Sequence, residues 1–377
     1  MKNILITGGA GFIGSNLALK LNDLGYTVTV LDNLSEQIHG PNPDNSALYQ
    51  SIKDKVIFIK GDVTNKTDLE KGIKGQDAII HLAAETGTGQ SMYSLEKYNE
   101  VNVSGTALLL DVLVNQKNSV KKLILASSRA VYGEGKYIDS KSEAVYPKSR
   151  SVAMMEKGNF EMIDEKGGFL KPSATDENTT LHPTSFYGLT KLQQEQMVKF
   201  VCESIGISYV ILRYQNVFGV GQSLLNPYTG ILSIFSTQIL NDQALNIFED
   251  GLMTRDFINI NDTVDATIRS LEMETANNEI INVGTSVATT VLSVANQLVT
   301  NYEKDTVVKI SGDFRIGDIR HNFADLEKAK QLLNFQPKVD FKTGIREFTN
   351  WVLQQPRTDN HFDQSLEELK NKGFLKS

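Results

Sequence analysis

A tyrosine and a lysine four residues apart, Tyr187 and Lys191, form the pair with the clearest chemical potential in this sequence of 377 residues. On a helix this spacing places both side chains on one face. A lysine beside a phenol stabilises the phenolate and lowers its pKa from about 10, so that the tyrosine becomes a base near neutral pH. Because such a pair often occurs by chance, its interpretation depends on the motifs around it.

A glycine-rich turn near the N-terminus supplies a second group of candidates. Gly8, Gly11 and Gly14 directly follow an apolar run at 3–7 and precede a helical pattern. Glycines at this spacing allow a tight turn, a close approach of the backbone and helix–strand packing, and a pyrophosphate can then bind at the helix N-terminus. The pattern predicts a dinucleotide site. The alternative is a strand–helix turn without a ligand.

The acid expected of a dinucleotide site follows the next predicted strand. Asp32 comes after Gly14 at close to the spacing of about 20 residues expected for the carboxylate that binds the adenosine ribose. Because a carboxylate repels a 2′-phosphate, it favours NAD over NADP. Asp62 ends the third strand, where it could accept from the adenine amine, and the small side chains of Ala83 and Ala84 end the fourth.

Alternating strands and helices must position these groups. Apolar runs predict strands at 3–7, 27–31, 56–60, 78–81, 123–127 and 209–212, with helical patterns between them at 66–73, 98–115 and 187–204. This alternation indicates an α/β fold with a doubly wound parallel sheet of the Rossmann type, in which the strand ends point toward a cofactor crevice.

Composition excludes several classes of partner. The net charge of −7 provides no basic surface for nucleic acid. The lone cysteine, Cys202, excludes an internal disulfide, and no Cys/His cluster has the spacing of metal ligands. The N-terminal residues already form a predicted strand, and no apolar run reaches the ~18 residues of a membrane span. We therefore expect a cytoplasmic protein with no metal, membrane or nucleic-acid partner.

The chain is long enough for two domains. We expect an NAD-binding Rossmann domain at 1–215, with a return segment at about 255–285, and a smaller C-terminal α/β substrate domain at 216–254 and 286–377. Residues 134–180 show no sustained period, which predicts an insertion that folds over another part of the molecule or stays mobile; the alternative is a surface excursion without a role. The charged residues 363–370 predict a solvated helix.

Together these motifs resemble the extended short-chain dehydrogenase/reductase superfamily, specifically its nucleotide-sugar epimerase/dehydratase branch. The resemblance covers almost the whole chain. Its markers are the glycine turn, Asp32, residues 61–63 and 81–84, Asn102, residues 127–133, Tyr187 with Lys191, and residues 213–219 and 255–257.

The resemblance implies a role for each member of the expected catalytic group. Tyr187 is the base that removes a proton from a sugar hydroxyl, Lys191 binds the nicotinamide ribose and lowers the pKa of Tyr187, and Ser128 holds the reacting oxygen. Asn102 lies in a helix that supports the cofactor site. The residues expected to bind NAD are Gly8, Gly11, Phe12, Ile13, Gly14, Asp32, Asn33, Asp62, Val63, Leu82, Ala83, Ala84, Asn102, Tyr187 and Lys191.

The resemblance also implies contacts with a nucleotide-diphosphate sugar. Asn216 contacts the diphosphate, and Arg255 with either Arg315 or Arg320 clamps its phosphates, since a planar guanidinium can bind phosphate oxygens bidentately. A surface or domain-bridging ion pair is the alternative for Arg315 and Arg320. The residues expected near the sugar are Thr86, Thr88, Gln90, Ser128 and Arg129.

Two departures narrow the expected reaction. Sugar-nucleotide 4,6-dehydratases carry an Asp-Glu pair directly after the serine or threonine, whereas this chain has Arg129 and Ala130 and so lacks the acid and base for elimination. The loop at 85–91 is richer in glycine than in galactose-type epimerases. With residues 32–40 and the insertion, it resembles a subgroup of dTDP-L-rhamnose 4-epimerases.

The expected function is the NAD-dependent epimerisation of a nucleotide-diphosphate sugar at C4. A hydride would pass from C4 to bound NAD⁺ and return to the other face of a transient 4-ketose, so NAD would stay bound. The alternative is a 4-ketosugar reductase with exchangeable NAD(P)H; a 4,6-dehydratase and a non-catalytic NAD-binding protein are less favoured. Many relatives form homodimers through two helices per subunit, for which the segments 98–115 and 187–204 are the candidates here.

Overall fold

The computed structural model describes residues 1–228, 230–357 and 362–376. Its centre is a seven-stranded sheet in the order β14-β9-β5-β4-β1-β2-β3, with every neighbouring pair parallel. The predicted α/β fold class is confirmed. The strands of this sheet are β1 (Asn3–Thr7), β2 (Thr27–Asp32), β3 (Ile57–Lys60), β4 (Ala78–His81), β5 (Lys122–Ser128), β9 (Ser208–Tyr214) and β14 (Glu279–Val283).

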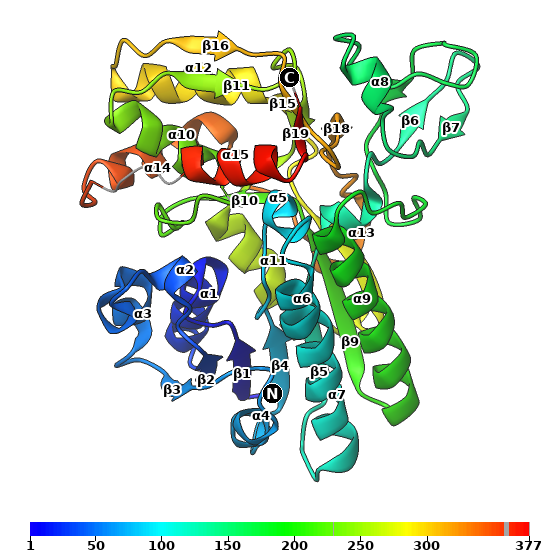
Figure 1. Cartoon of the computed structure of the whole chain (residues 1–377). Helices are drawn as coiled ribbons and strands as arrows, with labels where there is room; N and C mark the ends of the chain where they lie inside the picture. The colour runs from blue at the N-terminus through cyan, green and yellow to red at the C-terminus, as the bar shows by residue number, and fades with distance from the viewer. Residues whose placement is uncertain (229, 358–361, 377) are drawn as a thin grey trace.

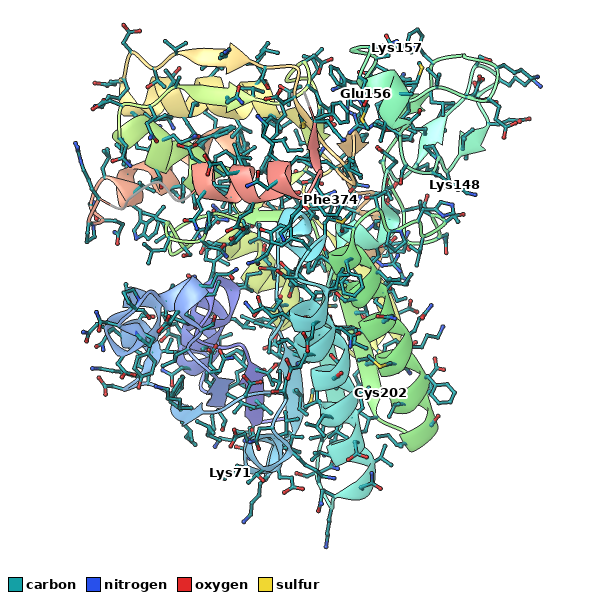
Figure 2. The ribbon with its side chains drawn as sticks, in the orientation of Figure 1. Lys71, Lys148, Glu156, Lys157, Cys202 and Phe374 are labelled. Carbon is teal, nitrogen blue, oxygen red and sulfur yellow. The ribbon has the colours of Figure 1, made fainter. Side chains whose placement is uncertain are left out.

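Alternating side chains on each strand enter two cores, one on each face of the sheet. Ile4 and Ile6 of β1 belong to the first core and Leu5 to the second, as the two-residue period of a strand requires. The first core is covered mainly by α1 (Phe12–Asp23) and α11 (Ile260–Glu272). The helices over the second core are α4 (Lys66–Ile73), α7 (Gly105–Asn115) and α9 (Phe186–Ile205), and Cys202 of α9 is buried there (Figure 2).

A second lobe with its own apolar core lies above the carboxyl ends of the sheet strands (Figure 1). Its main elements are α10 (Ile231–Leu240), α12 (Val291–Tyr302), α14 (Phe341–Val352), β11 (Leu245–Ile247) and β16 (Val308–Ile310). One element of the expected substrate domain packs elsewhere: α13 (Glu327–Leu333) places Ala329 and Leu333 in the first core of the sheet. The domain boundaries therefore stay a prediction.

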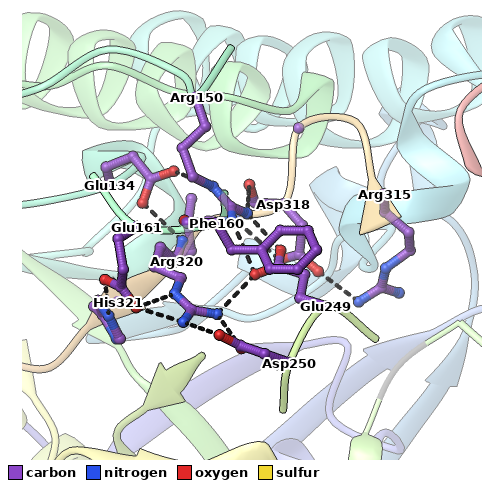
Figure 3. Close-up of polar contacts among 12 residues, drawn as sticks. Glu134, Arg150, Phe160, Glu161, Glu249, Asp250, Arg315, Asp318, Arg320 and His321 are labelled. Carbon is purple, nitrogen blue, oxygen red and sulfur yellow. Dashed lines mark hydrogen bonds and ion pairs between the residues drawn. The ribbon is translucent and has the colours of Figure 1, made fainter. Parts of the chain in front are cut away.

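The insertion at 134–180 is folded. Its three short strands, β6 (Tyr137–Ile138), β7 (Ala144–Val145) and β8 (Lys171–Pro172), form an antiparallel sheet, and α8 (Val152–Met155) precedes β8. Ion pairs attach it to the second lobe: Arg150 lies 2.7 Å from Glu249 (Figure 3). The insertion thus packs against another part of the molecule. This was one of the expectations stated for it, beside a mobile segment and a surface excursion without a role.

The C-terminal helix α15 (Phe362–Asn371) corrects the expectation of a solvated helix. One face packs near α5 (Thr88–Ser91), and Leu369 is buried. Glu368 accepts hydrogen bonds from Tyr93 (2.7 Å) and Tyr228 (3.1 Å). The charge pattern alone could not reveal this contact, because both tyrosines come from segments distant in sequence.

The remaining elements are short helices and strands, and some of the strands pair in small sheets of two or three. Among the described residues, no helix combines the length and the hydrophobicity needed to cross a bilayer. The other helices and strands are α2 (Glu36–His39), α3 (Ala47–Ile52), α6 (Leu95–Tyr98), β10 (Asn216–Phe218), β12 (Thr254–Arg255), β13 (Phe257–Asn259), β15 (Thr289–Thr290), β17 (Phe314–Arg315), β18 (His321–Asn322) and β19 (Leu375–Lys376), with a π-helical turn at Asn99–Ser104 and 3₁₀ turns at Pro43–Asn45, Arg129–Tyr132 and Glu274–Ala276.

Candidate active site

A cavity of about 460 Å³ lies between the carboxyl ends of the sheet strands and the second lobe. Open parallel sheets bind ligands at this edge, where the strand order reverses, here between β1 and β4. The predicted site residues that line the cavity are Gly8, Gly11, Phe12, Ile13, Gly14, Asp32, Asn33, Asp62, Val63, Leu82, Ala83, Ala84, Thr86, Thr88, Ser128, Arg129, Tyr187, Lys191 and Asn216.

The glycine turn, which we call the glycine cradle, leaves no room for side chains at Gly8 and Gly14. Gly8 has φ +68°, and a Cβ there would lie 2.7 Å from the backbone nitrogen of Ala83. A Cβ on Gly14 would lie 2.4 Å from the carbonyl oxygen of Gly8. Helix α1 begins at Phe12, and the N–H groups of its first turn have no partner within the helix. This end of the cavity therefore fits a pyrophosphate.

The residues predicted at the adenosine end form a hydrogen-bonded network. Asp32 accepts from the backbone N–H groups of Ala10 (2.9 Å) and Leu34 (2.8 Å), so it also ties the glycine turn to β2. Burial raises the pKa of Asp32. Each carboxylate oxygen keeps a second lone pair that could accept from a ribose hydroxyl. Asn33 donates to Asp62 at 2.8 Å, which fixes both side chains at the cavity wall.

The structure brings the three expected catalytic residues together. Ser128 ends β5, and Tyr187 and Lys191 lie in the first turns of α9, which begins after the N-cap Ser185. The Nζ of Lys191 donates to the carbonyl of Ala126 at 2.9 Å and lies 5.9 Å from the centre of the Tyr187 ring. A phenol, a hydroxyl and an amine therefore face one end of the cavity.

The pKa shifts in this group differ from the expected pattern. Burial raises the pKa of Tyr187, while a hydrogen bond with Ser128 and the positive charge of Arg129 lower it. Burial lowers the pKa of Lys191 to about 7. The groups that lower the pKa of Tyr187 in this structure are thus Ser128 and Arg129, rather than Lys191 as expected.

Asn102 acts on the site from behind the cavity wall. Its buried amide donates to the carbonyl of Glu85 (3.1 Å) and accepts from the N–H of Glu85 (2.8 Å). It also donates to Thr190 of α9 (3.0 Å). Asn102 is not part of the cavity lining. It therefore joins the loop after β4 to the helix that carries Tyr187, which is a supporting position rather than a direct contact.

Gln90, expected beside the sugar, instead forms a clasp with Gln37. The two side-chain amides exchange reciprocal hydrogen bonds of 3.1 Å each. Gln37 lies in α2, after β2, and Gln90 lies in α5, after β4. Because β1 separates β2 from β4 in the sheet, the pair spans the carboxyl end of β1, where the glycine turn lies. The clasp is therefore placed to retain a dinucleotide.

Opening this clasp is expected to accelerate the loss of NAD. A net hydrogen bond contributes about 1 kcal/mol and Gln37→Ala removes both bonds of the clasp, so this variant should raise the rate of NAD release roughly 30-fold. Gln90→Ala should have the same effect, and the double variant should add little, because either change removes both bonds. NAD release is measured by dilution and filtration. Gln116→Ala, which removes an amide exposed on the surface, is the control; additive effects of the two clasp variants would contradict the prediction.

The expected phosphate arginines bind a protein carboxylate instead. Arg255 and Arg315 each donate to Asp318 at 2.7 Å, and together they hold the pKa of Asp318 well below its usual range. Arg255 also donates to the carbonyls of Thr254 and Ile319. Neither arginine lines the cavity. Their phosphate role stays a prediction, and it requires them to exchange Asp318 for the ligand.

Arg320 lies in a different environment. Its side chain is fully buried, and its guanidinium donates to Glu161 of the insertion and to Glu249 and Asp250 of the second lobe (Figure 3). The residue lies outside the cavity lining. The structure therefore favours the domain-bridging ion pair that was the alternative interpretation of Arg320.

The second lobe adds polar residues that the sequence did not single out. Gln222, Asn226 and Tyr228 line the cavity opposite the sheet. The Oδ1 of Asn216 and the Oε1 of Gln222 are buried without a hydrogen-bond partner among the described residues. Buried polar atoms usually have partners, so these oxygens are available for a ligand.

Comparisons with known proteins give a consistent result. The model of the "NAD dependent epimerase/dehydratase family" matches residues 4–155 and 161–284. A dTDP-L-rhamnose 4-epimerase of Burkholderia thailandensis is 37% identical over 356 residues, covering 94% of this chain and 96% of that protein.

Two solved structures extend the comparison. The UDP-glucuronic acid 4-epimerase of Bacillus cereus, in complex with UDP-glucuronic acid and NAD, is similar with a TM-score of 0.77 and 28% identity, covering 93% of this chain and 99% of that one. The UDP-N-acetylglucosamine 4-epimerase of Methanobrevibacter ruminantium, in complex with UDP-N-acetylmuramic acid, has a TM-score of 0.74 and 32% identity, covering 94% and 99%.

Proposed function

The chain belongs to the NAD dependent epimerase/dehydratase family, and we propose that it inverts C4 of a nucleotide-diphosphate sugar with NAD as cofactor. The observation that carries this proposal is the meeting of Ser128, Tyr187 and Lys191 in the cavity that also contains the glycine cradle. The related 4-epimerases, one of them solved with NAD and a nucleotide sugar, support the same reaction.

Ser128, Tyr187 and Lys191 each have a separate role in the proposed reaction. Ser128 holds the C4 hydroxyl by a hydrogen bond, and Tyr187 removes its proton as the C4–H bond breaks. Bound NAD would supply a reversible hydride acceptor, so the reaction would have no net oxidation. Tyr187 then returns its proton to the C4 oxygen after the 4-ketose has turned in the cavity. Lys191 is placed to bind the nicotinamide ribose, and the cavity contributes position and electrostatics.

dTDP-L-rhamnose is the first candidate substrate. The 37% identical relative bears that substrate in its name, and this identity extends over nearly the full length of both chains. Arg129 and Ala130 stand where a dehydratase needs an acid and a base, which supports epimerisation over elimination. A 4-ketosugar reductase would use the same three side chains, so it is the second candidate. The cytoplasmic location stays a prediction.

Product analysis separates these two functions. Purified protein is incubated with dTDP-L-rhamnose and with a panel of dTDP-, UDP-, GDP- and CDP-sugars, and the products are identified by proton NMR. We expect a C4 epimer to form with protein-bound NAD only and with no change in reduced-nicotinamide absorbance. Reduction of a 4-ketosugar with consumption of NADH, without epimerisation of any sugar, would support the reductase instead.

We propose in addition that two copies of the chain associate through α7 and α9, which lie side by side (Figure 1). Leu189 and Phe200 are three helical turns apart on one face of α9 and are exposed, Phe200 by 73%. Phe200→Glu is expected to convert a dimer into a monomer in light-scattering measurements. Phe169→Glu, at an equally exposed position in the insertion, is the control. A monomeric wild-type protein at micromolar concentration would contradict the proposal.

A further inference from the structure

Arg129 occupies an unusual position beside the reacting end of the cavity. It follows Ser128 directly and opens the 3₁₀ turn Arg129–Tyr132, in which the backbone N–H of Ala130 donates to the Ser128 hydroxyl at 3.2 Å. The same turn places Arg129 in the cavity lining with Ser128 and Tyr187. The position of its charge is therefore set by the backbone that also orients Ser128.

The guanidinium of Arg129 has no hydrogen bond or ion pair in the part of the chain that the structure describes. Other arginines near the cavity are paired: Arg213 lies 2.7 Å from Glu195, and Arg255 lies 2.7 Å from Asp318. Asp318 already holds both Arg255 and Arg315, so it offers Arg129 only a longer-range attraction. Arg129 is half-buried at the cavity wall. A cation without a local partner in such a place favours an anion at a neighbouring group.

Tyr187 is the neighbouring group that can become an anion. The interactions of Arg129 and Tyr187 are mutual: the cation lowers the pKa of the phenol, and the phenolate raises that of the guanidinium. Burial and the charge of Arg255 lower the pKa of Arg129 to about 9, which still leaves it charged at neutral pH. By contrast, the pKa of Lys191 is about 7, so Lys191 is only partly charged there.

The other groups that face Tyr187 do not supply a fixed charge. Ser128 is a neutral hydroxyl that bonds the phenol. Tyr98, at the end of α6, packs edge-on against the Tyr187 ring with 6.4 Å between the ring centres. Burial raises the pKa of Tyr98 far above the usual range, so Tyr98 stays neutral. On α9, Lys191 donates to the Ala126 carbonyl. Arg129 is thus the cation near Tyr187 that stays charged throughout the neutral range.

We propose that Arg129 is a positioning residue that keeps Tyr187 available as the base, by stabilising its phenolate with a fixed positive charge. This role rests on the proposed function, in which Tyr187 takes the C4 hydroxyl proton. Arg129 stands where a dehydratase carries an acid, and this role gives the arginine a use in epimerisation, which needs no acid there.

Titration of Tyr187 tests the proposal directly. Phenolate absorbance is recorded against pH in the NAD-loaded protein, and the contribution of Tyr187 is obtained by subtracting Tyr187→Phe. Arg129→Met should raise the titration midpoint by about one pH unit or more, because the loss of a nearby opposite charge raises the pKa of an acid. Arg129→Lys should recover most of the shift. The acidic limb of the kcat–pH profile should move upward by the same amount.

Controls separate this role from packing and from the proposed function. Arg269→Met, which removes a guanidinium paired with Asp265 on the far helix α11, should leave the midpoint unchanged. If Arg129→Met does not fold, Arg129→Gln provides the neutral variant. Reduced activity with an unshifted titration would overturn the proposal. A shifted titration in a protein that epimerises no nucleotide sugar would instead reject the proposed function while the charge effect stands.

Discussion

Tyr187→Phe is expected to lower kcat by roughly 10²–10⁴-fold, the usual contribution of general acid–base catalysis, while NAD stays bound. The substitution removes only the hydroxyl. The ring keeps its edge-on contact with Tyr98, and the glycine cradle at the other end of the cavity is untouched. Turnover is measured by NMR of the product, and the bound NAD is released by denaturation and quantified.

A conservative substitution elsewhere provides the comparison. Tyr146→Phe, in the insertion, removes a phenolic hydroxyl outside the cavity lining and should preserve both kcat and NAD content. If Tyr187→Phe retained most of the activity, another group would have to take the proton, and the assigned roles of Ser128 and Lys191 would have to change with it.

Gly14→Ala is expected to weaken NAD binding by roughly 5–150-fold, the equivalent of an overpacking cost of about 1–3 kcal/mol. The new Cβ would lie 2.4 Å from the Gly8 oxygen and 2.6 Å from the Gly9 Cα, both of which are backbone atoms that cannot rotate away. Helix α1 must therefore move relative to β1, and its N-terminus leaves the position that suits a pyrophosphate. Equilibrium titration with NAD measures the effect.

The matched control is a glycine that tolerates a side chain. In Gly72→Ala, on α4, the Cβ would meet Leu5 at 3.5 Å, an ordinary contact distance, so NAD affinity should not change. Equal losses of NAD affinity in both variants would indicate general destabilisation, and unchanged affinity in Gly14→Ala would contradict the assignment of the cradle.

Local pattern was sufficient to predict much of the fold. The first six strands of the sheet and the helix α4 follow from apolar runs and helical periods, because each forms from neighbouring residues. The strand β14, which pairs with β9, was not predicted, although its Ile280, Ile281 and Val283 lie in a short apolar run. The glycine turn and the Tyr187–Lys191 spacing identified the two ends of the cavity for the same local reason.

Side-chain partners between distant segments could not be predicted in this way. The binding of Arg255 to Asp318, the burial of Arg320 among acids of the insertion and the second lobe, and the pairing of Gln37 with Gln90 all join segments that are distant in sequence. The sequence showed that Arg129 replaces an acid. It could not show that the guanidinium lacks a partner beside Tyr187, because that depends on Asp318 being occupied.

In the proposed reaction a hydride leaves C4 and returns to the same carbon within one bound complex. The most direct test uses a nucleotide-diphosphate sugar that carries deuterium at C4, incubated with the NAD-loaded protein in ordinary water and in the presence of free unlabelled NADH. We expect a C4-epimerised product that retains its deuterium, with none found in solvent or in free NADH. Transfer of the deuterium to the free cofactor, or its loss to water, would contradict it.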